Sequence, residues 1–273
     1  MANVPVSCPN CKRNVVIDNT MTNSTCNYCN LTFNVNQAIS SYIKTNNNIS
    51  DFEIINGVLK KYNNTSSSVN IPNNVTKIGE NAFRKCSKLK YINIPNSVTE
   101  IDDNAFEGCS NLQAINLPNS ITRIGECAFW GCSNLQAITI SNSIKKIEAF
   151  TFAGCSSLKN IDIPDGVEEI KPYAFLKCSG LIYINLPVSV TTIESGVFRE
   201  CFSLDSLTIP NNVTHLSSSA FDKCSEHLVF NSNNLKRFNV PLINRRKNKG
   251  KCLSCGGEIT IWGRKCKNCG RYN

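Results

Sequence analysis

Long hydrophobic runs and a secretory leader are both missing from this 273-residue sequence. No apolar stretch reaches the roughly 18 residues that a membrane-spanning helix needs. The N-terminal segment, MANVPVSCPN, has neither the charged start nor the apolar stretch of a secretory signal. These absences predict a cytoplasmic protein with no membrane span.

Histidine is scarce, and the sequence shows no catalytic motif. Its two histidines are His215 and His227, and it contains no phosphate-binding loop, HExxH pair or nucleophile elbow. His215 occupies a variable repeat position, which indicates the surface. A nucleophile made of Cys224 and His227 is conceivable, but a packing pair at the end of the repeats is the simpler interpretation. The sequence therefore predicts a protein that is not an enzyme.

Acidic residues are almost missing from residues 236–273, which carry 11 basic side chains and 1 acidic one, a net +10. Residues 61–235 carry 14 basic and 16 acidic side chains, a net −2. The positive charge thus belongs to the C-terminal segment, where lysine and arginine can displace the counterions of a nucleic acid. The alternative is a solvated tail that attracts any acidic surface. The candidate nucleic-acid contacts are Arg245, Arg246, Lys247, Lys249 and Lys251.

Sixteen cysteines could indicate a disulfide-bonded secreted protein, but their spacing argues against it. Eight form four CxxC pairs near the two ends, seven recur at a fixed interval, and Cys127 is left over. CxxC pairs without a signal peptide are typical of metal ligands. The N-terminal set is Cys8, Cys11, Cys26 and Cys29, and the C-terminal set is Cys252, Cys255, Cys266 and Cys269.

Each set of four thiolates can surround one metal ion tetrahedrally, and each stretch resembles a zinc ribbon. The N-terminal stretch contains no histidine, which favours a structural ion over a catalytic one. We expect two structural zinc ions, one in residues 1–35 and one in residues 251–273. The spacing leaves iron open as the metal, and a redox-active CxxC pair is the other alternative.

The centre of the chain is a repeat of fixed length. Residues 95–117 read PNSVTEIDDNAFEGCSNLQAINL, and the next 23 residues read PNSITRIGECAFWGCSNLQAITI. A phenylalanine and a cysteine recur every 23 residues, from Phe83 and Cys86 onwards. A fixed period without insertions predicts a solenoid. Its seven repeats begin at Pro72, Pro95, Pro118, Ser141, Pro164, Pro187 and Pro210.

Within each repeat, apolar and polar residues alternate as they do in a strand. In the first repeat we expect Ile92 and Ile94 inside and Tyr91 and Asn93 outside. The proline that follows ends the strand, because it has no N–H to donate. The segment ENAFRKC has the spacing of one helical or 3₁₀ turn. The repeated cysteine is expected to pack as a small buried hydrophobe.

The pattern IPxxVTxIGxxAFxxCxxLxxIxI resembles the leucine-rich repeats of bacterial surface antigens of the BspA-like class, over about residues 51–230. This resemblance implies a right-handed solenoid with a parallel sheet on one face, used for protein–protein binding and adhesion. Residues 51–71 are expected to form its N-terminal cap. The fourth repeat is irregular, with Ser141 in place of proline and Thr151 in place of alanine.

The predicted fold is a β-rich leucine-rich repeat solenoid with short helical or 3₁₀ turns, flanked by two small four-cysteine zinc ribbons. The expected parts are a zinc ribbon (1–35), a linker (36–50), the solenoid of a cap and seven repeats (51–235), a basic linker (236–250) and a zinc ribbon (251–273).

We expect a non-enzymatic scaffold that binds an unknown protein partner on its strand face. The alternatives are a nucleic-acid-associated protein, and a surface adhesin, which would need an export route that the sequence does not show. Trp130 is either a contact residue or an isolated surface aromatic. The candidate partner-binding residues are Lys90, Tyr91, Asn93, Gln113, Asn116, Gln136, Thr139, Lys159, Asn160, Asp162, Tyr183 and Asn185.

Overall fold

The computed structural model describes residues 3–8, 10, 14–18, 22–35, 51–225, 228–231, 238 and 266. By its contacts the chain divides into two compact units, Met1–Glu53 and Ile54–Asn273. Among the described residues, none belongs to a helix with the length and apolarity needed to cross a membrane. The expected linkers and the C-terminal zinc ribbon lie outside the described residues, apart from Phe238 and Cys266, so these boundaries stay predictions.

The N-terminal unit contains two antiparallel hairpins. In one, β1 (Asn3–Ser7) pairs with β2 (Asn14–Asp18). In the other, β3 (Asn23–Thr25) pairs with β4 (Thr32–Asn34). In chain order, one CxxC segment falls between the two strands of each hairpin, so each hairpin contributes one CxxC pair to the predicted site.

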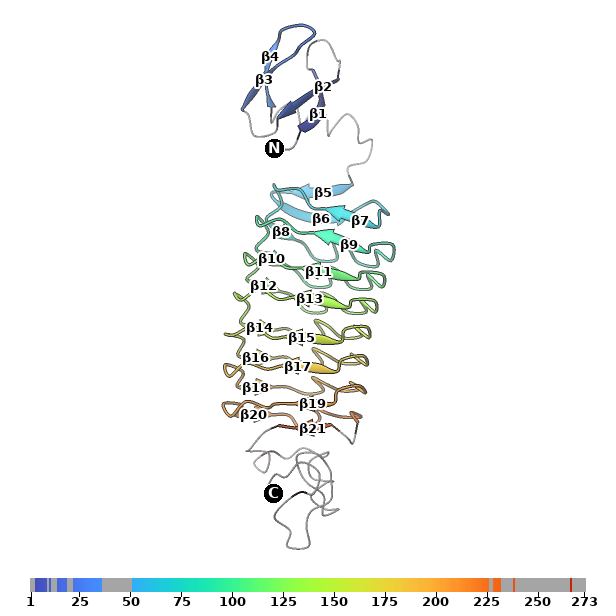
Figure 1. Ribbon diagram of the computed structural model, residues 1–273, viewed down its shortest axis with the longest axis vertical. Helices are drawn as coiled ribbons and strands as arrows, with labels where there is room; N and C mark the ends of the chain where they lie inside the picture. Colours follow the sequence, from blue (N-terminus) through green and yellow to red (C-terminus); the bar gives the residue numbers. More distant parts are fainter. Residues whose placement is uncertain are drawn as a thin grey trace. The chain divides into compact units, whose positions relative to one another are not determined.

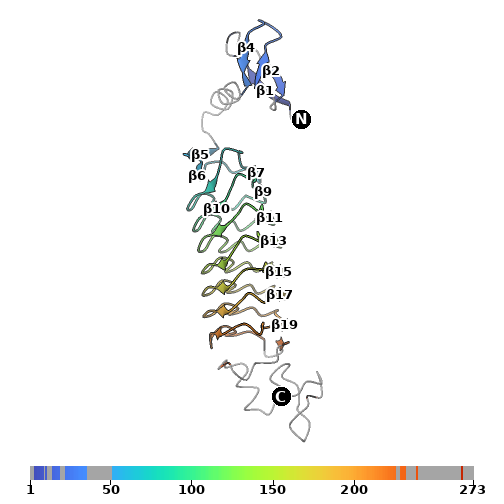
Figure 2. The same cartoon turned by 90° about the vertical axis from the view of Figure 1, so that its left-hand side faces the viewer.

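The solenoid stacks its repeats so that equivalent residues of successive coils pair in parallel, for example Ile92 with Ile115 and Ile78 with Ile101 (Figure 1; Figure 2). Two sets of strands result, and we name them face A and face B. Face A comprises β7 (Ser68–Asn70), β9 (Tyr91–Asn93), β11 (Ala114–Asn116), β13 (Ala137–Thr139), β15 (Asn160–Asp162), β17 (Tyr183–Asn185), β19 (Ser206–Leu207) and β21 (Val229–Phe230).

Face B lies on another side of each coil. It comprises β5 (Phe52–Ile55), β6 (Val58–Tyr62), β8 (Lys77–Ile78), β10 (Glu100–Ile101), β12 (Arg123–Ile124), β14 (Lys146–Ile147), β16 (Glu169–Ile170), β18 (Thr192–Ile193) and β20 (His215–Leu216). The strands of face A confirm the expected LxxIxI strand. The second parallel sheet, formed by the VTxI segment, was not predicted.

The core is a stack of identical side chains. Phenylalanines of adjacent coils lie parallel with ring centroids 5.0 Å apart between Phe83 and Phe106, and 5.8 Å apart between Phe175 and Phe198. Tyr62 covers the N-terminal end of this stack at 5.1 Å from Phe83. Because each coil exposes apolar edges that only its neighbours can bury, the core is continuous along the solenoid.

The side of each coil opposite the faces is a run of turns, where the sequence predicted one helical or 3₁₀ turn. Coils are numbered as the repeats, so coil 1 begins at Pro72. In coil 1, the backbone N–H groups of Asn81, Phe83 and Lys85 donate to carbonyls of the next coil at 2.6–3.2 Å. The N–H groups of the residues between them donate to carbonyls three residues earlier. Asn81 and Lys85 have φ values of 59° and 58°. A helix requires right-handed φ at every residue. The left-handed residues, two on the turn side of each of coils 1–6 and Lys223 in coil 7, therefore prevent one.

Both faces are interrupted between coils 3 and 4. Face A is divided between β13 and β15, and face B between β12 and β14. The turn side stays closed there, since the Cys127 N–H donates to the Ala149 carbonyl at 3.0 Å. The interruption coincides with Ser141, which is fully buried and whose Oγ donates to the Asn119 carbonyl at 3.1 Å.

At the corner of coil 4 between face A and face B, the serine at the recurring position bonds to a different carbonyl of the preceding coil than its equivalents do. Ser97, Ser120 and Ser189 each donate their Oγ to a carbonyl 22 residues earlier. Ser143 instead donates to the carbonyl of Asn119, 24 residues earlier. This corner connects the two faces and lies at the junction where both ladders open, while the turn side remains paired.

Candidate functional site

Three of the four predicted N-terminal ligands meet in the structure. The Sγ atoms of Cys8, Cys26 and Cys29 lie within 4.8 Å of one another. The Sγ atoms of Cys8 and Cys29 are 3.6 Å apart. Cys11, the fourth predicted ligand, lies outside the described residues.

The Cys26–Cys29 segment forms a tight turn between β3 and β4. The Tyr28 N–H donates to the Sγ of Cys26 at 3.5 Å, and the Asn30 N–H donates to the carbonyl of Cys26 at 2.9 Å. Asn30 is left-handed, with φ 55°, which asparagine tolerates better than most residues. The turn therefore directs both sulfur atoms of its CxxC pair towards Cys8.

The Cys29 thiol is favoured as a thiolate. The backbone N–H of Leu31 is the main cause that lowers the pKa of Cys29 to about 6; burial opposes it, and the thiols of Cys8 and Cys26 add smaller effects in the same direction as Leu31. Hydrogen bonds to the charged form stabilise that form. The arrangement thus supplies the sulfur species that metals bind.

The C-terminal candidates cannot be placed in the same way. Cys266 is buried, whereas Cys252, Cys255 and Cys269 lie outside the described residues. The basic candidates Arg245, Arg246, Lys247, Lys249 and Lys251 also lie outside them. The second zinc ion and the nucleic-acid contacts therefore stay predictions.

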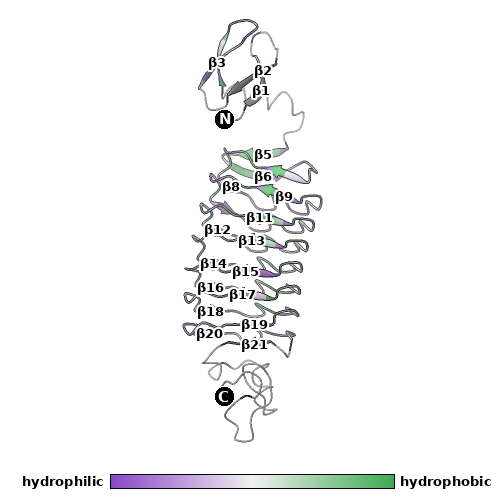
Figure 3. Cartoon of the chain, viewed as in Figure 1, coloured by the Kyte–Doolittle hydropathy of each residue, from purple (hydrophilic) through white to green (hydrophobic). Residues whose placement is uncertain are grey.

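Face A presents the predicted partner-binding residues to solvent. All twelve are exposed except Gln113, which is half-buried and accepts a hydrogen bond from the Tyr91 hydroxyl at 2.6 Å. Figure 3 shows β15 as the most hydrophilic strand of this face, in keeping with Asn160 and Asp162. Ile92 and the equivalent isoleucines are buried, as the alternation predicted.

Coils 5 and 6 carry exposed apolar residues at positions that are polar in most other coils. Ile182 is 44% exposed where Lys90 and Gln113 stand in earlier coils. Phe202 is 56% exposed in a column of serines, and Val188 is 73% exposed in a column of asparagine and aspartate. Tyr183 was predicted from the sequence as a contact residue, whereas Ile182, Phe202 and Val188 were not, although a comparison of equivalent repeat positions shows them.

A row of aromatic side chains lies on the turn side. Trp130 is 47% exposed, and its ring centroid is 6.3 Å from that of Phe150. Phe150 in turn stacks on Tyr173 at 5.0 Å. Trp130 is therefore not an isolated surface aromatic, because its ring lies beside that of Phe150.

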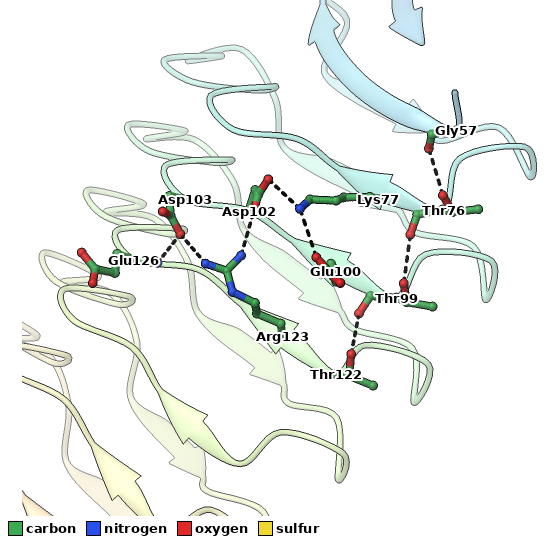
Figure 4. A network of polar contacts seen from close by, with 10 residues as sticks. All are labelled: Gly57, Thr76, Lys77, Thr99, Glu100, Asp102, Asp103, Thr122, Arg123 and Glu126. Atoms are coloured by element: carbon green, nitrogen blue, oxygen red, sulfur yellow. Dashed lines mark hydrogen bonds and ion pairs between the residues drawn. The ribbon is translucent and has the colours of Figure 1, made fainter. Parts of the chain in front are cut away.

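Face B uses its charges in internal ion pairs (Figure 4). Lys77 Nζ lies 3.0 Å from carboxylate oxygens of both Glu100 and Asp102. Arg123 contacts Asp102 at 2.6 Å and Asp103 at 2.9 Å. Charges that are already paired within the chain offer less to a partner, which favours face A as the binding surface.

The same side of the solenoid also carries a threonine ladder. In Figure 4, the hydroxyl of each threonine donates to the backbone carbonyl of the preceding coil. Thr76 donates to Gly57, Thr99 to Thr76, and Thr122 to Thr99, at 3.2–3.3 Å. These hydroxyls therefore support coil stacking.

The residues considered for a nucleophile have structural contacts. The Cys224 thiol donates to the Phe198 carbonyl at 2.9 Å, and burial raises its pKa to about 12. Its proposed partner His227 lies outside the described residues. His215 is exposed, with Nε2 3.8 Å from a carboxylate oxygen of Glu194. A neutral, half-buried thiol that donates to a carbonyl is a poor nucleophile, so Cys224 fits a packing role.

Comparison with known proteins identifies the repeat. A model described as "BspA type Leucine rich repeat region" matches residues 60–155 and 111–227. A leucine-rich repeat protein from Eubacterium ventriosum is 28% identical with a TM-score of 0.58, over 62% of this chain and 47% of that one. This chain thus spans about half the length of that relative.

Two further solved structures share the fold. The leucine-rich repeat protein of T. pallidum is 26% identical with a TM-score of 0.52, over 70% of this chain and 86% of that one. A leucine-rich repeat protein from Bacteroides ovatus is 22% identical with a TM-score of 0.50, over 80% of this chain and 60% of that one, which shows the fold alone. No curated protein matches the chain.

Proposed function

The chain belongs to the BspA-type leucine-rich repeat family, and from this premise we propose that it is a non-enzymatic scaffold that binds another protein along face A. Proteins of this architecture are generally binding scaffolds, because stacked repeats create one long surface on a rigid support. The proposal places the contact on the outward residues of the face A strands and on the exposed apolar residues beside them.

The exposed apolar side chains of coils 5 and 6 are the observation that carries this proposal. Ile182, Tyr183 and Phe202 are each between 44% and 56% exposed. The repeat itself does not need them, since equivalent positions in other coils hold lysine, alanine or serine. Exposed apolar groups rimmed by polar residues mark interaction surfaces, and tyrosine is enriched among residues that dominate binding energy.

Matched isoleucine variants test this assignment. Ile182 and Ile55 are 44% and 50% exposed, but Ile55 belongs to β5 of the cap on face B. A protein partner is first captured with the full chain from the cytosol of the source organism and then purified. We expect Ile182→Ser combined with Tyr183→Ala to raise the Kd for that partner by about tenfold or more, which is about 1.4 kcal/mol.

The control variant Ile55→Ser should leave the Kd unchanged. Equal weakening by the combined Ile182→Ser and Tyr183→Ala variant and by Ile55→Ser would contradict a site on face A. Retention of no protein above background by the full chain would contradict the scaffold itself.

A nucleic-acid role for the C-terminal segment is the second candidate function. It is supported by the net +10 of residues 236–273, with 11 basic side chains against 1 acidic one. Binding of this kind weakens steeply as salt rises. We expect a labelled duplex to bind the full chain in low salt and to be lost on deletion of residues 236–273; binding that salt does not change would exclude this role.

The resemblance to surface antigens leaves an adhesin as a third candidate beside a cytoplasmic scaffold. Cell fractionation of the source organism separates the two, because an adhesin is recovered with the cell surface. In either location, the same face A variants report on the partner.

A further inference from the structure

The N-terminal cysteines differ from those of the solenoid in what faces their sulfur atoms. In the solenoid, each buried thiol donates to a carbonyl of the preceding coil, as Cys132 does to Phe106 at 3.2 Å. In the N-terminal unit, three sulfur atoms face one another instead, with Cys8 and Cys29 3.6 Å apart. Packing accounts for the first arrangement but not for the second.

The distances distinguish a metal site from a disulfide. A disulfide holds its sulfur atoms about 2.05 Å apart. Four sulfurs placed about 2.3 Å from a zinc ion at tetrahedral angles lie about 3.8 Å from one another. The 3.6 Å between Cys8 and Cys29 matches the edge of that tetrahedron, and the third sulfur lies within 4.8 Å of both.

We propose that this cluster binds one zinc ion as a structural centre, with Cys8, Cys26 and Cys29 as three thiolate ligands. The CxxC spacing with Cys8 predicts Cys11, which lies outside the described residues, as the fourth ligand. Zinc fits because it takes tetrahedral thiolate sets in closed structural sites. This inference is independent of the binding role proposed for face A, since it rests on different residues of a different unit.

The backbone around the cluster supports a metal-binding turn. The Tyr28 N–H donates to the Sγ of Cys26 and thereby stabilises negative charge on that sulfur. Hydrogen bonds from surrounding groups to metal ligands orient those ligands and tune their charge. Cys8 follows β1 of one hairpin, and Cys26 and Cys29 lie between the paired strands β3 and β4 of the other, so each half of the site is attached to an antiparallel pair of strands.

The short length of the unit, Met1–Glu53, favours stabilisation by an ion. Its described buried apolar side chains, apart from the cysteines, are Val15, Phe33 and Val35. Units of this size bury too little surface to fold alone and are commonly stabilised by a metal. Zinc binding therefore supplies folding free energy to this unit.

Metal analysis of the full chain, purified without added metal, tests the proposal. We expect Cys26→Ser and Cys8→Ser to lose one zinc equivalent per chain relative to the wild type, whatever the C-terminal cysteines bind. Cys127→Ser is the matched control, because Cys127 is a half-exposed cysteine outside every CxxC pair, and it should keep the wild-type zinc content.

A ligand exchange separates loss of the site from loss of the fold. Cys29→His still offers a zinc ligand, so it should retain zinc, and its cobalt-substituted form should show d–d bands shifted to higher energy. Chelation should expose residues 1–50 to protease while the solenoid stays resistant. Unchanged zinc in Cys26→Ser, iron in place of zinc, or a Cys8–Cys29 disulfide in unreduced protein would each overturn the proposal.

Discussion

Truncation of Phe106 to alanine tests whether the stacked rings hold the solenoid together. Phe106 is fully buried, and its ring lies 5.0 Å from that of Phe83 and 5.3 Å from that of Phe129, nearly parallel to both. Each such pair contributes about 0.5–1.5 kcal/mol beyond the burial of its area. Removal of the ring also leaves a cavity, and the backbone ladders of the adjacent coils limit collapse around it. We therefore expect a loss of about 3–5 kcal/mol.

Urea denaturation followed by circular dichroism measures this loss, and the exposed phenylalanine of coil 6 provides the control. Phe202 is 56% exposed, so Phe202→Ala removes the same atoms without opening a cavity and should change stability by less than about 0.5 kcal/mol. The comparison requires equal urea dependence in both variants, because repeat arrays can unfold in parts. A cost below about 1 kcal/mol for Phe106→Ala, or equal costs for both variants, would refute the stacked core as the main source of stability.

Three further predictions concern titration, backbone conformation and surface charge. Burial raises the pKa of Cys132 and Cys178 to about 12, whereas unfolded thiols ionise near about 8.5. Between these values the unfolded state binds fewer protons than the folded state, so the urea midpoint should fall as the pH rises from about 9 to 12. The fall should be smaller in Cys132→Ala. Lys177→Gly should raise stability by about 0.5 kcal/mol because φ is 57° there. The control Lys159→Gly, at a residue without positive φ, should lower it; equal effects in melting curves would contradict this reasoning. Asp102→Asn breaks two exposed ion pairs and should cost at most about 1 kcal/mol, a difference that melting in about 1 M salt should abolish.

The sequence was sufficient for those features that every coil repeats. Phe83 and its equivalents are buried, as their fixed period predicted, and so are Leu89 and Ile92. Tyr91 and Asn93 point outwards because side chains alternate along a strand. A position that recurs seven times averages out local exceptions, so its role can be predicted without coordinates.

The turn side was not predictable in the same way, because backbone handedness leaves little trace in residue type. One left-handed column contains Gly108, Gly131 and Gly154, which hint at it, but also Lys177 and Glu200, which do not. Hydrogen bonds between coils over-determine these conformations, and left-handed residues of any type are then tolerated.

Cys127, which the repeat pattern left unexplained, belongs to the other left-handed column, with φ 54°. Its neighbours in that column include Asn81, Asn104 and Phe150. The column selects a backbone conformation and not a side chain, so cysteine there needs no chemical role. Cys127 therefore does not belong to the series of seven cysteines that recur every 23 residues.

The junction between coils 3 and 4 shows how one substitution is contained. Where Ser141 replaces proline, both faces lose their pairing, so the junction depends on the contacts that remain. Phe129 and Phe152 still stack across it at 5.6 Å, and Trp130 of coil 3 meets Phe150 of coil 4 outside the core. Because each coil touches only its neighbours, the disturbance stays at one junction. Trp130 thus has a ring contact across this junction. No ring contact of this kind is described for Ile182, Tyr183 or Phe202, which makes these residues of coils 5 and 6 the stronger evidence for a binding surface.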